Sequence, residues 1–435
     1  MAGIIHTTVP MNITRRRLMT GTIGVFAGVA TGRAVLAQTG SATPEAETTL
    51  EGGPERIHSL LAMIPESFGV QSAVEGVVFY YADLKRQLES VGVSPYEPGS
   101  DSVPAGYTGA LIVLATASIG FQYGLEPEFV STFGFSALQA EESLSVGSPP
   151  NDLTIFRGGL PIADLPSVWE ASGYARETTD TGVDIWTAGR EGDVDLTSNV
   201  SRYGVGALNN VAIFDDTVVF GRFFTDVELV AKQVAEPGPS VVDGAGLTDL
   251  LSTLAEETVS AIAVTGSFLN LNSLLLPEQL EETSALIEES DANIGAFPEP
   301  ESAIFAITGG TTGPDFVATG EGTPAASPVG ESTETDGGVV QVRLQLTSED
   351  DAATAVAAVE YRWNALSSAR MGAPFTELMT IITAEPDPIV GTVAAIDFRE
   401  VQRAGTWIDI VLSRDLVPFA WVGDLPVEAS PTAAG

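Results

Sequence analysis

The hydrophobic positions of this chain follow two periods. Ile57, Leu60, Leu61 and Ile64 are spaced three or four residues apart, which predicts a helix with one buried face. Residues 340–346 alternate strictly between apolar and polar side chains, which predicts a strand with one buried face. Both patterns recur along the rest of the chain, so the folded part is expected to contain helices and strands.

Strands are predicted where branched and aromatic side chains gather between turn residues. The clearest hairpin joins residues 211–214 to residues 218–220 through Asp215-Asp216-Thr217. The other predicted strands are residues 77–81, 153–156, 174–177, 183–186, 259–264, 303–308, 340–346, 390–398 and 407–412.

Further helices are predicted from apolar stripes and from the residues that begin them. Ser348 and Asp351 have the spacing of a capping box, and so do Thr225 and Glu228. Residues 109–121 form an apolar run that fits either a helix or a strand. The remaining predicted helices cover residues 82–91, 162–172, 247–256 and 277–290.

The order strand, helix, strand, strand occurs over residues 153–186 and again over residues 340–412. Hairpins imply antiparallel pairing. The expected fold class is therefore α+β, with antiparallel sheets, helices packed on one face, and two related strand-helix-strand-strand units. A common motif used twice by chance is the alternative interpretation. The expected divisions are an α+β domain at 55–298, a second α+β unit at 299–426 with a disordered loop at 320–338, and a disordered tail at 427–435.

The first 37 residues have the three parts of an export signal. Arg15, Arg16 and Arg17 form the basic part, and residues 18–32 form an uncharged run of 15 residues. That run is shorter than the roughly 20 apolar residues that a membrane-spanning helix needs. Cleavage is predicted between Ala37 and Gln38. Residues 38–54, rich in Thr, Ala, Glu, Gly and Pro, are predicted to form a disordered linker.

This segment resembles a twin-arginine signal peptide. Thr14 precedes the Arg15-Arg16 pair, Leu18 occupies the apolar position of the motif, and Arg33 follows the apolar run. The resemblance implies that the twin-arginine (Tat) translocase exports the folded protein to the cell envelope or the outside of the cell. A general secretory signal and an uncleaved anchor are the alternatives.

A second resemblance covers about half of the chain. Residues 77–92, the turn 147–150 before residues 153–158, Trp169 and Gly173-Tyr174 are similar to the corresponding parts of a group of large exported bacterial proteins with no assigned activity. The resemblance implies no catalytic residue.

Composition narrows the chemistry that is open to the protein. The net charge of -39 repels nucleic acid and anionic membranes, which proteins bind through Lys and Arg. The absence of cysteine excludes disulfides, thiolate metal sites and cysteine nucleophiles. Lys85 and Lys232 are the two lysines, and neither lies in a phosphate-binding loop or a Ser-x-x-Lys motif.

Histidine is scarce as well. His6 belongs to the predicted signal, which leaves His58 as the one histidine of the exported part. Two imidazoles therefore cannot bind a metal within one chain, and a Ser-His-Asp triad would have to use His58. We interpret His58 as a surface or capping residue.

Carboxylates are abundant, and three groups of them stand out. Asp180-Thr181-Gly182 matches the tripeptide of aspartic proteases, but no second copy exists, and we interpret it as a hairpin turn. Asp193 with Asp195, and Asp215 with Asp216, are candidate oxygen ligands for Ca²⁺. Since no EF-hand spacing accompanies them, turn and cap residues are the preferred interpretation.

Arginine is concentrated in the last unit, at positions that could form an anion site or ordinary ion pairs, and ion pairs are preferred. These residues are Arg343, Arg362, Arg370, Arg399, Arg403 and Arg414.

The sequence thus assigns no catalytic, cofactor-binding or metal residue. We expect an exported, non-enzymatic protein that binds a ligand or acts in surface interactions. A carboxylate-based extracellular hydrolase of the glycosidase type and a solute-binding protein are the alternatives.

Overall fold

The fold is known from a computed structural model of residues 1–435. It describes residues 52–68, 76–97, 104, 107–115, 123–124, 126–148, 151–190, 192, 195, 197–203, 206–244, 246–275, 277–309, 338–401 and 405–422. All of them belong to one compact unit, Thr48–Gly435. The predicted export signal, its cleavage site, nearly all of the predicted linker and of the loop 320–338, and the tail lie outside the described residues.

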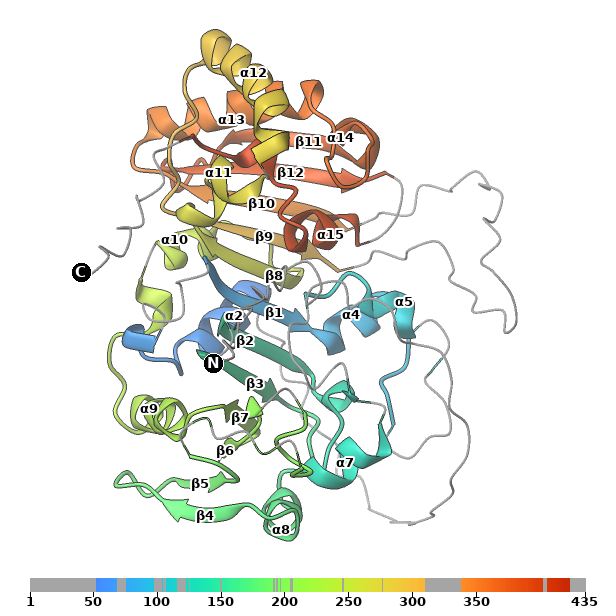
Figure 1. The fold of residues 1–435 in the computed structure, drawn as a ribbon, viewed down its shortest axis with the longest axis vertical. Helices are drawn as coiled ribbons and strands as arrows, with labels where there is room; N and C mark the ends of the chain where they lie inside the picture. Colours follow the sequence, from blue (N-terminus) through green and yellow to red (C-terminus); the bar gives the residue numbers. More distant parts are fainter. Residues whose placement is uncertain are drawn as a thin grey trace, which may run out of the picture. The chain divides into compact units, whose positions relative to one another are not determined.

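One antiparallel sheet of twelve strands organises this unit (Figure 1). The strand order is β11-β12-β10-β9-β8-β1-β2-β3-β7-β6-β5-β4. The strands are β1 (Val77–Asp83), β2 (Glu142–Ser148), β3 (Asn151–Arg157), β4 (Ala175–Thr178), β5 (Asp184–Thr187), β6 (Asn210–Phe214), β7 (Thr217–Gly221), β8 (Thr258–Thr265), β9 (Ser302–Thr308), β10 (Val339–Gln345), β11 (Met379–Pro386) and β12 (Val393–Glu400).

The central strands are buried on both faces, and this explains their sequences. Along β8, Ala261 and Ala263 pack in one core while Ile262 and Val264 pack in another on the opposite face. A strand with two buried faces needs a continuous apolar run rather than an alternating one, and residues 259–264 form such a run, interrupted only by Ser260.

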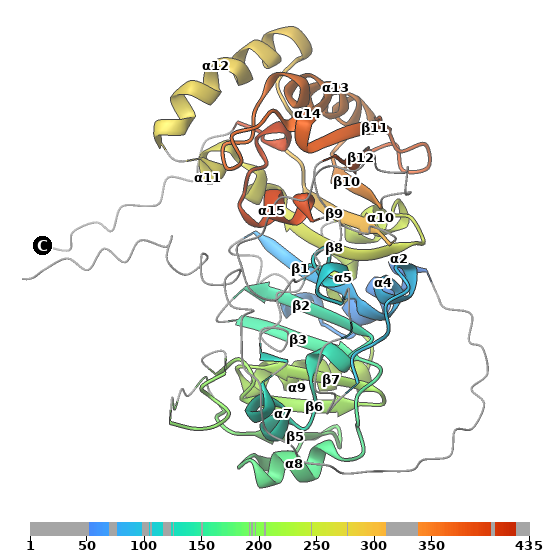
Figure 2. The same ribbon diagram turned by 90° about the vertical axis from the view of Figure 1, so that its right-hand side faces the viewer.

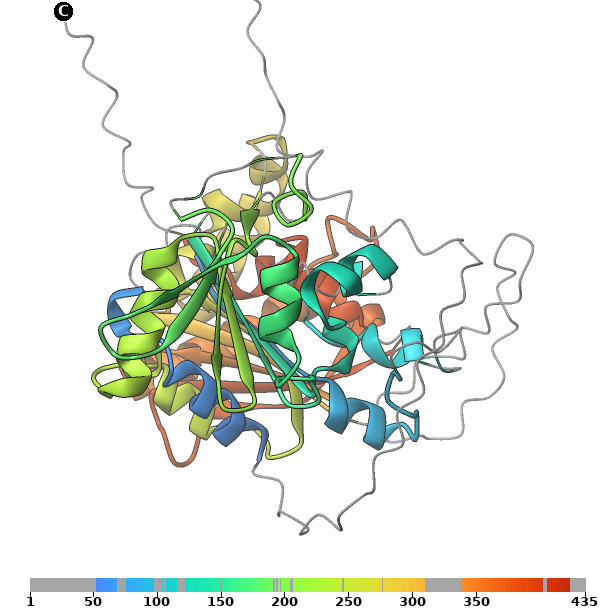
Figure 3. The same ribbon diagram turned by 90° about the horizontal axis from the view of Figure 1, so that it is seen from below.

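Helices cover both faces of the sheet (Figures 2 and 3). The α2 face carries α2 (Gly53–Leu61), α9 (Phe224–Ala235) and α10 (Leu247–Ser252). The opposite face, here called the α13 face, carries α7 (Pro127–Phe133), α8 (Leu165–Ala171), α13 (Glu349–Ala365), α14 (Phe375–Leu378) and α15 (Thr406–Leu412). The remaining helices are α4 (Leu84–Ser90), α5 (Tyr107–Leu111), α11 (Leu271–Leu274) and α12 (Pro277–Ile294), with short turns η2 (Ala137–Gln139), η4 (Val241–Asp243), η5 (Gly266–Leu269) and η6 (Val417–Phe419).

The predicted α+β class with antiparallel pairing is confirmed. The helices lie on both faces rather than on one, because the strands bury apolar side chains on both sides and each side needs a cover. The sheet also continues across the predicted boundary between residues 298 and 299, since β9 pairs with β8 on one side and with β10 on the other.

The order strand, helix, strand, strand occurs twice, but the second unit contains β11, which was not predicted, in place of a strand at residues 407–412, which form a helix. In the first half β3, α8, β4 and β5 follow one another, and in the second half β10, α13, β11 and β12 do. In each half a later strand pairs with the strand that precedes the helix. β7 pairs with β3, and β12 pairs with β10. The first half contains the additional hairpin β6–β7.

Residues 407–412 form α15 and not the predicted strand. Trp407, Ile410 and Val411 are buried at helical spacing, and Gly405 begins the helix with a φ of 80°. The Glu400 carboxylate accepts hydrogen bonds from the backbone N–H groups of Gly405 and Trp407, so it caps the helix.

Capping predictions had mixed outcomes. Ser348 begins α13 and accepts a hydrogen bond from the backbone N–H of Asp351 at 3.1 Å, as predicted. The predicted capping box at Thr225 is wrong, because α9 begins one residue earlier and its cap residue, Phe223, has no side-chain oxygen.

We predict that Gly266→Ala destabilises the protein. An added Cβ would lie 1.6 Å from the backbone oxygen of Pro300, where β8 ends and Trp421 donates to the Gly266 oxygen at 2.9 Å. The free energy of unfolding, measured by urea denaturation, should fall by at least about 2 kcal/mol. Gly109→Ala, whose Cβ meets no atom within 4 Å, should leave it unchanged or slightly raised. If both substitutions changed the free energy of unfolding equally, the close approach of Gly266 to Pro300 would be contradicted.

Candidate functional site

Among the described residues, a buried cluster of charges surrounds Glu142 at the start of β2. Its Oε1 accepts hydrogen bonds from Arg56 Nε and from the Tyr81 hydroxyl, the latter at 2.7 Å. Its Oε2 accepts from Arg157 Nε, and Arg157 also donates to the Ser59 hydroxyl at 2.7 Å. The cluster therefore connects α2 to β1, β2 and β3.

Asp83 lies at the edge of this cluster. Its Oδ1 caps α4 by accepting from the backbone N–H of Arg86 at 2.9 Å, and its Oδ2 lies 3.4 Å from Arg56 Nη1. Burial raises the pKa of Asp83 to about 6, because the single ion pair with Arg56 does not offset the lost hydration. Burial alone would also raise the pKa of Glu142, but hydrogen bonds from Arg157 and Arg56 bring it below the ordinary value. Because the cluster is enclosed and its groups bind one another, we interpret it as a structural tie and not as a reaction site.

The structure places His58 and the Asp180 turn as predicted. His58 is exposed on α2. Asp180-Thr181-Gly182 lies in the turn between β4 and β5, where Gly182 has a φ of 81° and donates its N–H to the Thr179 oxygen at 2.9 Å. The strand before this turn, β4, ends in Glu177 and Thr178 and not in the apolar residues that precede the tripeptide in aspartic proteases. The turn therefore has the sequence of a tight hairpin connection.

The Ca²⁺ candidates are turn residues wherever they are described. Asp195 accepts hydrogen bonds from the backbone N–H and the hydroxyl of Thr197, while Asp193 lies outside the described residues. Asp215, with a φ of 51°, and Asp216 form the two-residue turn between β6 and β7. Among the described residues, no group of three or more His, Cys, Asp or Glu side chains has a geometry that could hold a metal ion.

The arginines of the last unit do not converge. Arg343 pairs with Asp397 at 2.7 Å and Arg362 with Asp291 at 2.8 Å, both as buried arginines on different elements. Arg414 lies over the ring of Phe268, 4.7 Å from its centroid. Arg403 lies outside the described residues, and the exposed Arg370 and Arg399 belong to a loop and to β12. The predicted ion pairs are thus present for two of the six.

A groove follows β11, the last strand at one end of the sheet. Its volume is about 330 Å³. One wall is α13 and the other is β11, with one residue from α14. The lining residues are Glu360, Trp363, Asn364, Thr376, Thr380, Ile381, Ile382, Thr383 and Ala384. We refer to this site as the β11 groove.

The geometry of β11 leaves one side of the strand open. Among the described strands β11 pairs with β12 alone, so no described strand pairs with the backbone groups on its other side. A bulge between Ile381 and Thr383 turns Ile382 outward, and 45% of this side chain is exposed. The groove therefore joins an unpaired strand edge to hydroxyl, amide and carboxylate side chains.

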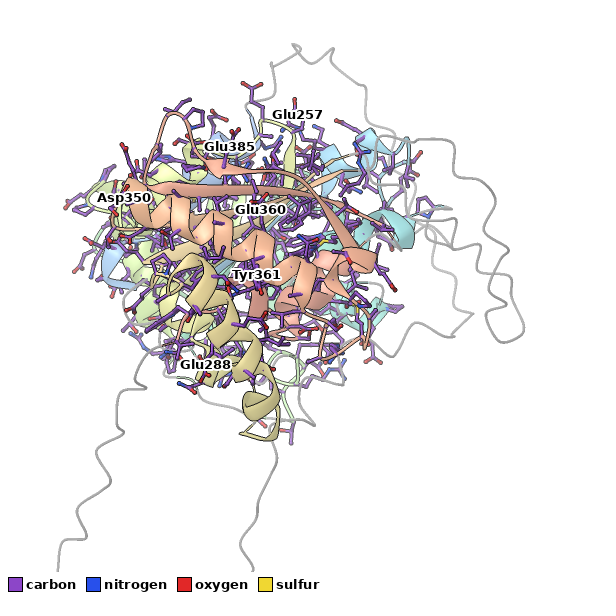
Figure 4. All side chains as sticks on the ribbon, turned by 90° about the horizontal axis from the view of Figure 1, so that it is seen from above. Glu257, Glu288, Asp350, Glu360, Tyr361 and Glu385 are labelled. Atoms are coloured by element: carbon purple, nitrogen blue, oxygen red, sulfur yellow. The ribbon has the colours of Figure 1, made fainter. Side chains whose placement is uncertain are left out.

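A second hollow of about 560 Å³ continues the groove over α13. It is lined by Glu360, Tyr361, Asn364 and Ala365. The Tyr361 hydroxyl donates to Glu289 Oε1 of α12 at 3.1 Å and lies 3.4 Å from Asn293 Nδ2. Figure 4 shows Glu360 and Tyr361 on α13, with α12 beside them.

Sequence reasoning missed this site because it missed β11. The run Met379-Thr380-Ile381-Ile382-Thr383 is rich in branched side chains and was a usable strand signal. The same reasoning missed β2, whose Ser, Gly and Glu residues are poor strand formers.

Comparisons with known proteins add little. No family model matches the sequence, and no curated protein matches it either. A solved structure described as crystal form I of TP0453 is similar to this chain at 8% identity, covers 81% of this chain and 96% of its own, and has a TM-score of 0.34. At that score the likeness carries no argument about function. Within the part of the chain that is described, no helix has the length and apolar character to cross a membrane.

We predict that Asp83→Asn changes how stability depends on pH. The pKa of Asp83 is higher in the folded state than the ordinary 3.8, so its contribution favours folding below about pH 4 and is lost as the pH rises through about 6. Relative to the Asn variant, the wild type should lose roughly 2 to 3 kcal/mol of unfolding free energy between pH 4 and pH 7. Chemical denaturation across this range measures the difference. A wild type that gains stability relative to the variant over the same range would contradict the assignment.

Proposed function

We propose that this chain is an exported binding protein that takes an extended segment of a partner along the free edge of β11. The observation that carries the proposal is the β11 groove, where an unpaired strand edge and a lined depression coincide. Adding a strand to an exposed sheet edge is a recurring way to bind peptides, in which backbone hydrogen bonds supply affinity and side-chain pockets supply specificity.

The other end of the sheet supports the choice of β11. β4 has four residues, and ion pairs of Arg176 with Asp184 and of Arg190 with Glu177 lie along it. Short strands and charged pairs are ways in which proteins block an edge. β11 is twice as long, no described strand pairs on its outer side, and its bulge and Pro386 occupy only part of its length.

The lining chemistry supports binding rather than hydrolysis. Among the groove's lining residues, all of which are described, Glu360 is the one carboxylate. Glycoside hydrolysis requires two opposed carboxyl groups about 5 to 10 Å apart. The Thr376 hydroxyl and the Asn364 amide, which line the groove, can hydrogen-bond a ligand.

Export is the second part of the proposal, and it rests on the sequence alone. The Arg15-Arg16 pair, Leu18 and the small residues before Gln38 support passage through the Tat translocase and cleavage after Ala37.

We expect replacement of Arg15 and Arg16 together by lysine to stop export, because the translocase reads the guanidinium pair. Immunodetection in cytoplasmic and exported fractions would measure it, with Arg33→Lys as the matched control. Export of the double variant at the wild-type level would refute the twin-arginine route.

The binding part is tested with peptides selected from a random twelve-residue display library against the full chain. Peptides that add to β11 should lose at least tenfold in affinity when every second backbone nitrogen is methylated, because each loses the N–H groups that pair with the strand. Asn364→Trp, which fills the groove, should weaken them by a similar factor, measured by fluorescence anisotropy.

Glu288→Trp, an equally large change on the exposed surface of α12, is the control and should have no effect. Selected peptides that tolerate both methylation and Asn364→Trp would exclude strand addition at β11.

A further inference from the structure

We infer that the segment bound at the β11 groove is cationic, with Lys or Arg on alternate positions. The inference rests on the proposed strand addition and specifies the class of partner. It is carried by the charges that surround the free edge.

Three carboxylates stand at this end of the sheet, two of them on the α13 side of the groove. Glu360 projects from α13 into both hollows and Glu377 follows Thr376, whereas Glu385 pairs in register with Ala395 and leaves β11 on the face away from α13. All three side chains are exposed. Within the described part of the chain none of them forms an ion pair, although ten other ion pairs occur there.

The nearby cations do not neutralise the α13 side of the edge. Arg362 is buried and is occupied by Asp291, Ser290 and the Ala420 oxygen. Arg399 pairs in register with Thr380, but it alternates with Phe398, which packs under α13. Its side chain therefore leaves the sheet on the opposite face.

The position of Glu360 suits recognition of an added strand. A β-strand places successive side chains on opposite faces, so every second residue of an added strand faces α13. A Lys or Arg at those positions faces Glu360, whereas Thr380 and Thr383 project from the other face of β11. A segment with acidic residues there would meet both the local carboxylates and the net charge of -39.

A second copy of this chain fits the edge poorly. Each copy would bring the same negative charge, and edge pairing would align β11 with a strand that carries Glu385, Pro386 and the bulge at Ile382. Charge, proline and a bulge are devices that prevent pairing between like edges. A separate basic segment brings neither the like charge nor a second bulge and proline, and it can set its register to the bulge of β11.

The test uses three labelled ten-residue peptides that alternate valine with lysine, glutamine or glutamate, titrated into the full chain in 50 mM salt. The lysine peptide should bind at least tenfold more tightly than the glutamine peptide, and the glutamate peptide should bind most weakly. Raising the salt to 300 mM should reduce the preference for lysine, because exposed charges are screened.

Variants separate a local site from the overall field. Glu360→Gln and Glu377→Gln should each raise the dissociation constant of the lysine peptide about two- to fivefold, as expected for exposed ion pairs. Glu288→Gln and Glu257→Gln remove the same charge elsewhere on the surface and should leave it unchanged (Figure 4).

The outcomes distinguish this inference from the proposal beneath it. Equal affinity for the lysine and glutamine peptides, with sensitivity to backbone methylation and to Asn364→Trp, would overturn the charge preference and leave strand addition in place. Equal effects of all four Gln variants would also overturn it, because only the net charge would then matter. Binding insensitive to methylation and to Asn364→Trp would overturn both.

Discussion

The structure depends on the pairing of β1 with β8 in the middle of a sheet that is buried on both faces. These strands lie far apart in the sequence, and each also pairs with its own half of the sheet, β1 with β2 and β8 with β9. Their apolar runs bury side chains in separate cores on the two faces. Removing such side chains from water stabilises a fold by roughly 25 cal/mol per Å², so helices must cover both faces. The buried Glu142 fixes α2 to this centre through Arg56 and Tyr81.

An open sheet necessarily ends in two edges, and the two are treated differently. At β4 the edge is short and bordered by ion pairs, whereas at β11 it is long, bulged and bordered by carboxylates without ion pairs among the described residues. The groove beside β11 is formed by α13, which the core holds in place through Trp363 and its hydrogen bond to the Met379 oxygen. The buried core thus positions the free edge of β11, and this arrangement suits a binding surface.

Much of the fold was predictable where the local signals were strong. Residues 340–346 alternate clearly and form most of β10, and the stripe from Ala352 to Leu366 forms α13 behind the predicted Ser348 cap. The prediction that this strand buries one face is wrong, because Gln341, Arg343 and Gln345 are buried as well. The hairpin β6–β7 followed from two aspartates between branched residues. Residues close in sequence determine these elements, so a local sequence pattern is enough to predict them.

What escaped prediction depends on distant contacts. Trp407 to Leu412 is apolar enough for a strand, and it is helical because Glu400 caps it and because the buried side chains have one core to enter. β2 is stabilised by its neighbours and by the pairs around Glu142 rather than by its own propensity. The site was missed for the same reason: a free strand edge is a property of the whole sheet order, which no local pattern contains.

The most direct measurement is backbone hydrogen exchange of the full chain with and without the alternating lysine–valine peptide. If an extended cationic segment adds to the sheet, the amides of β11 should exchange more slowly in the complex, while those of β4 at the opposite edge should not change. Protection at β4, or unchanged exchange throughout β11 when the peptide is bound, would contradict the account.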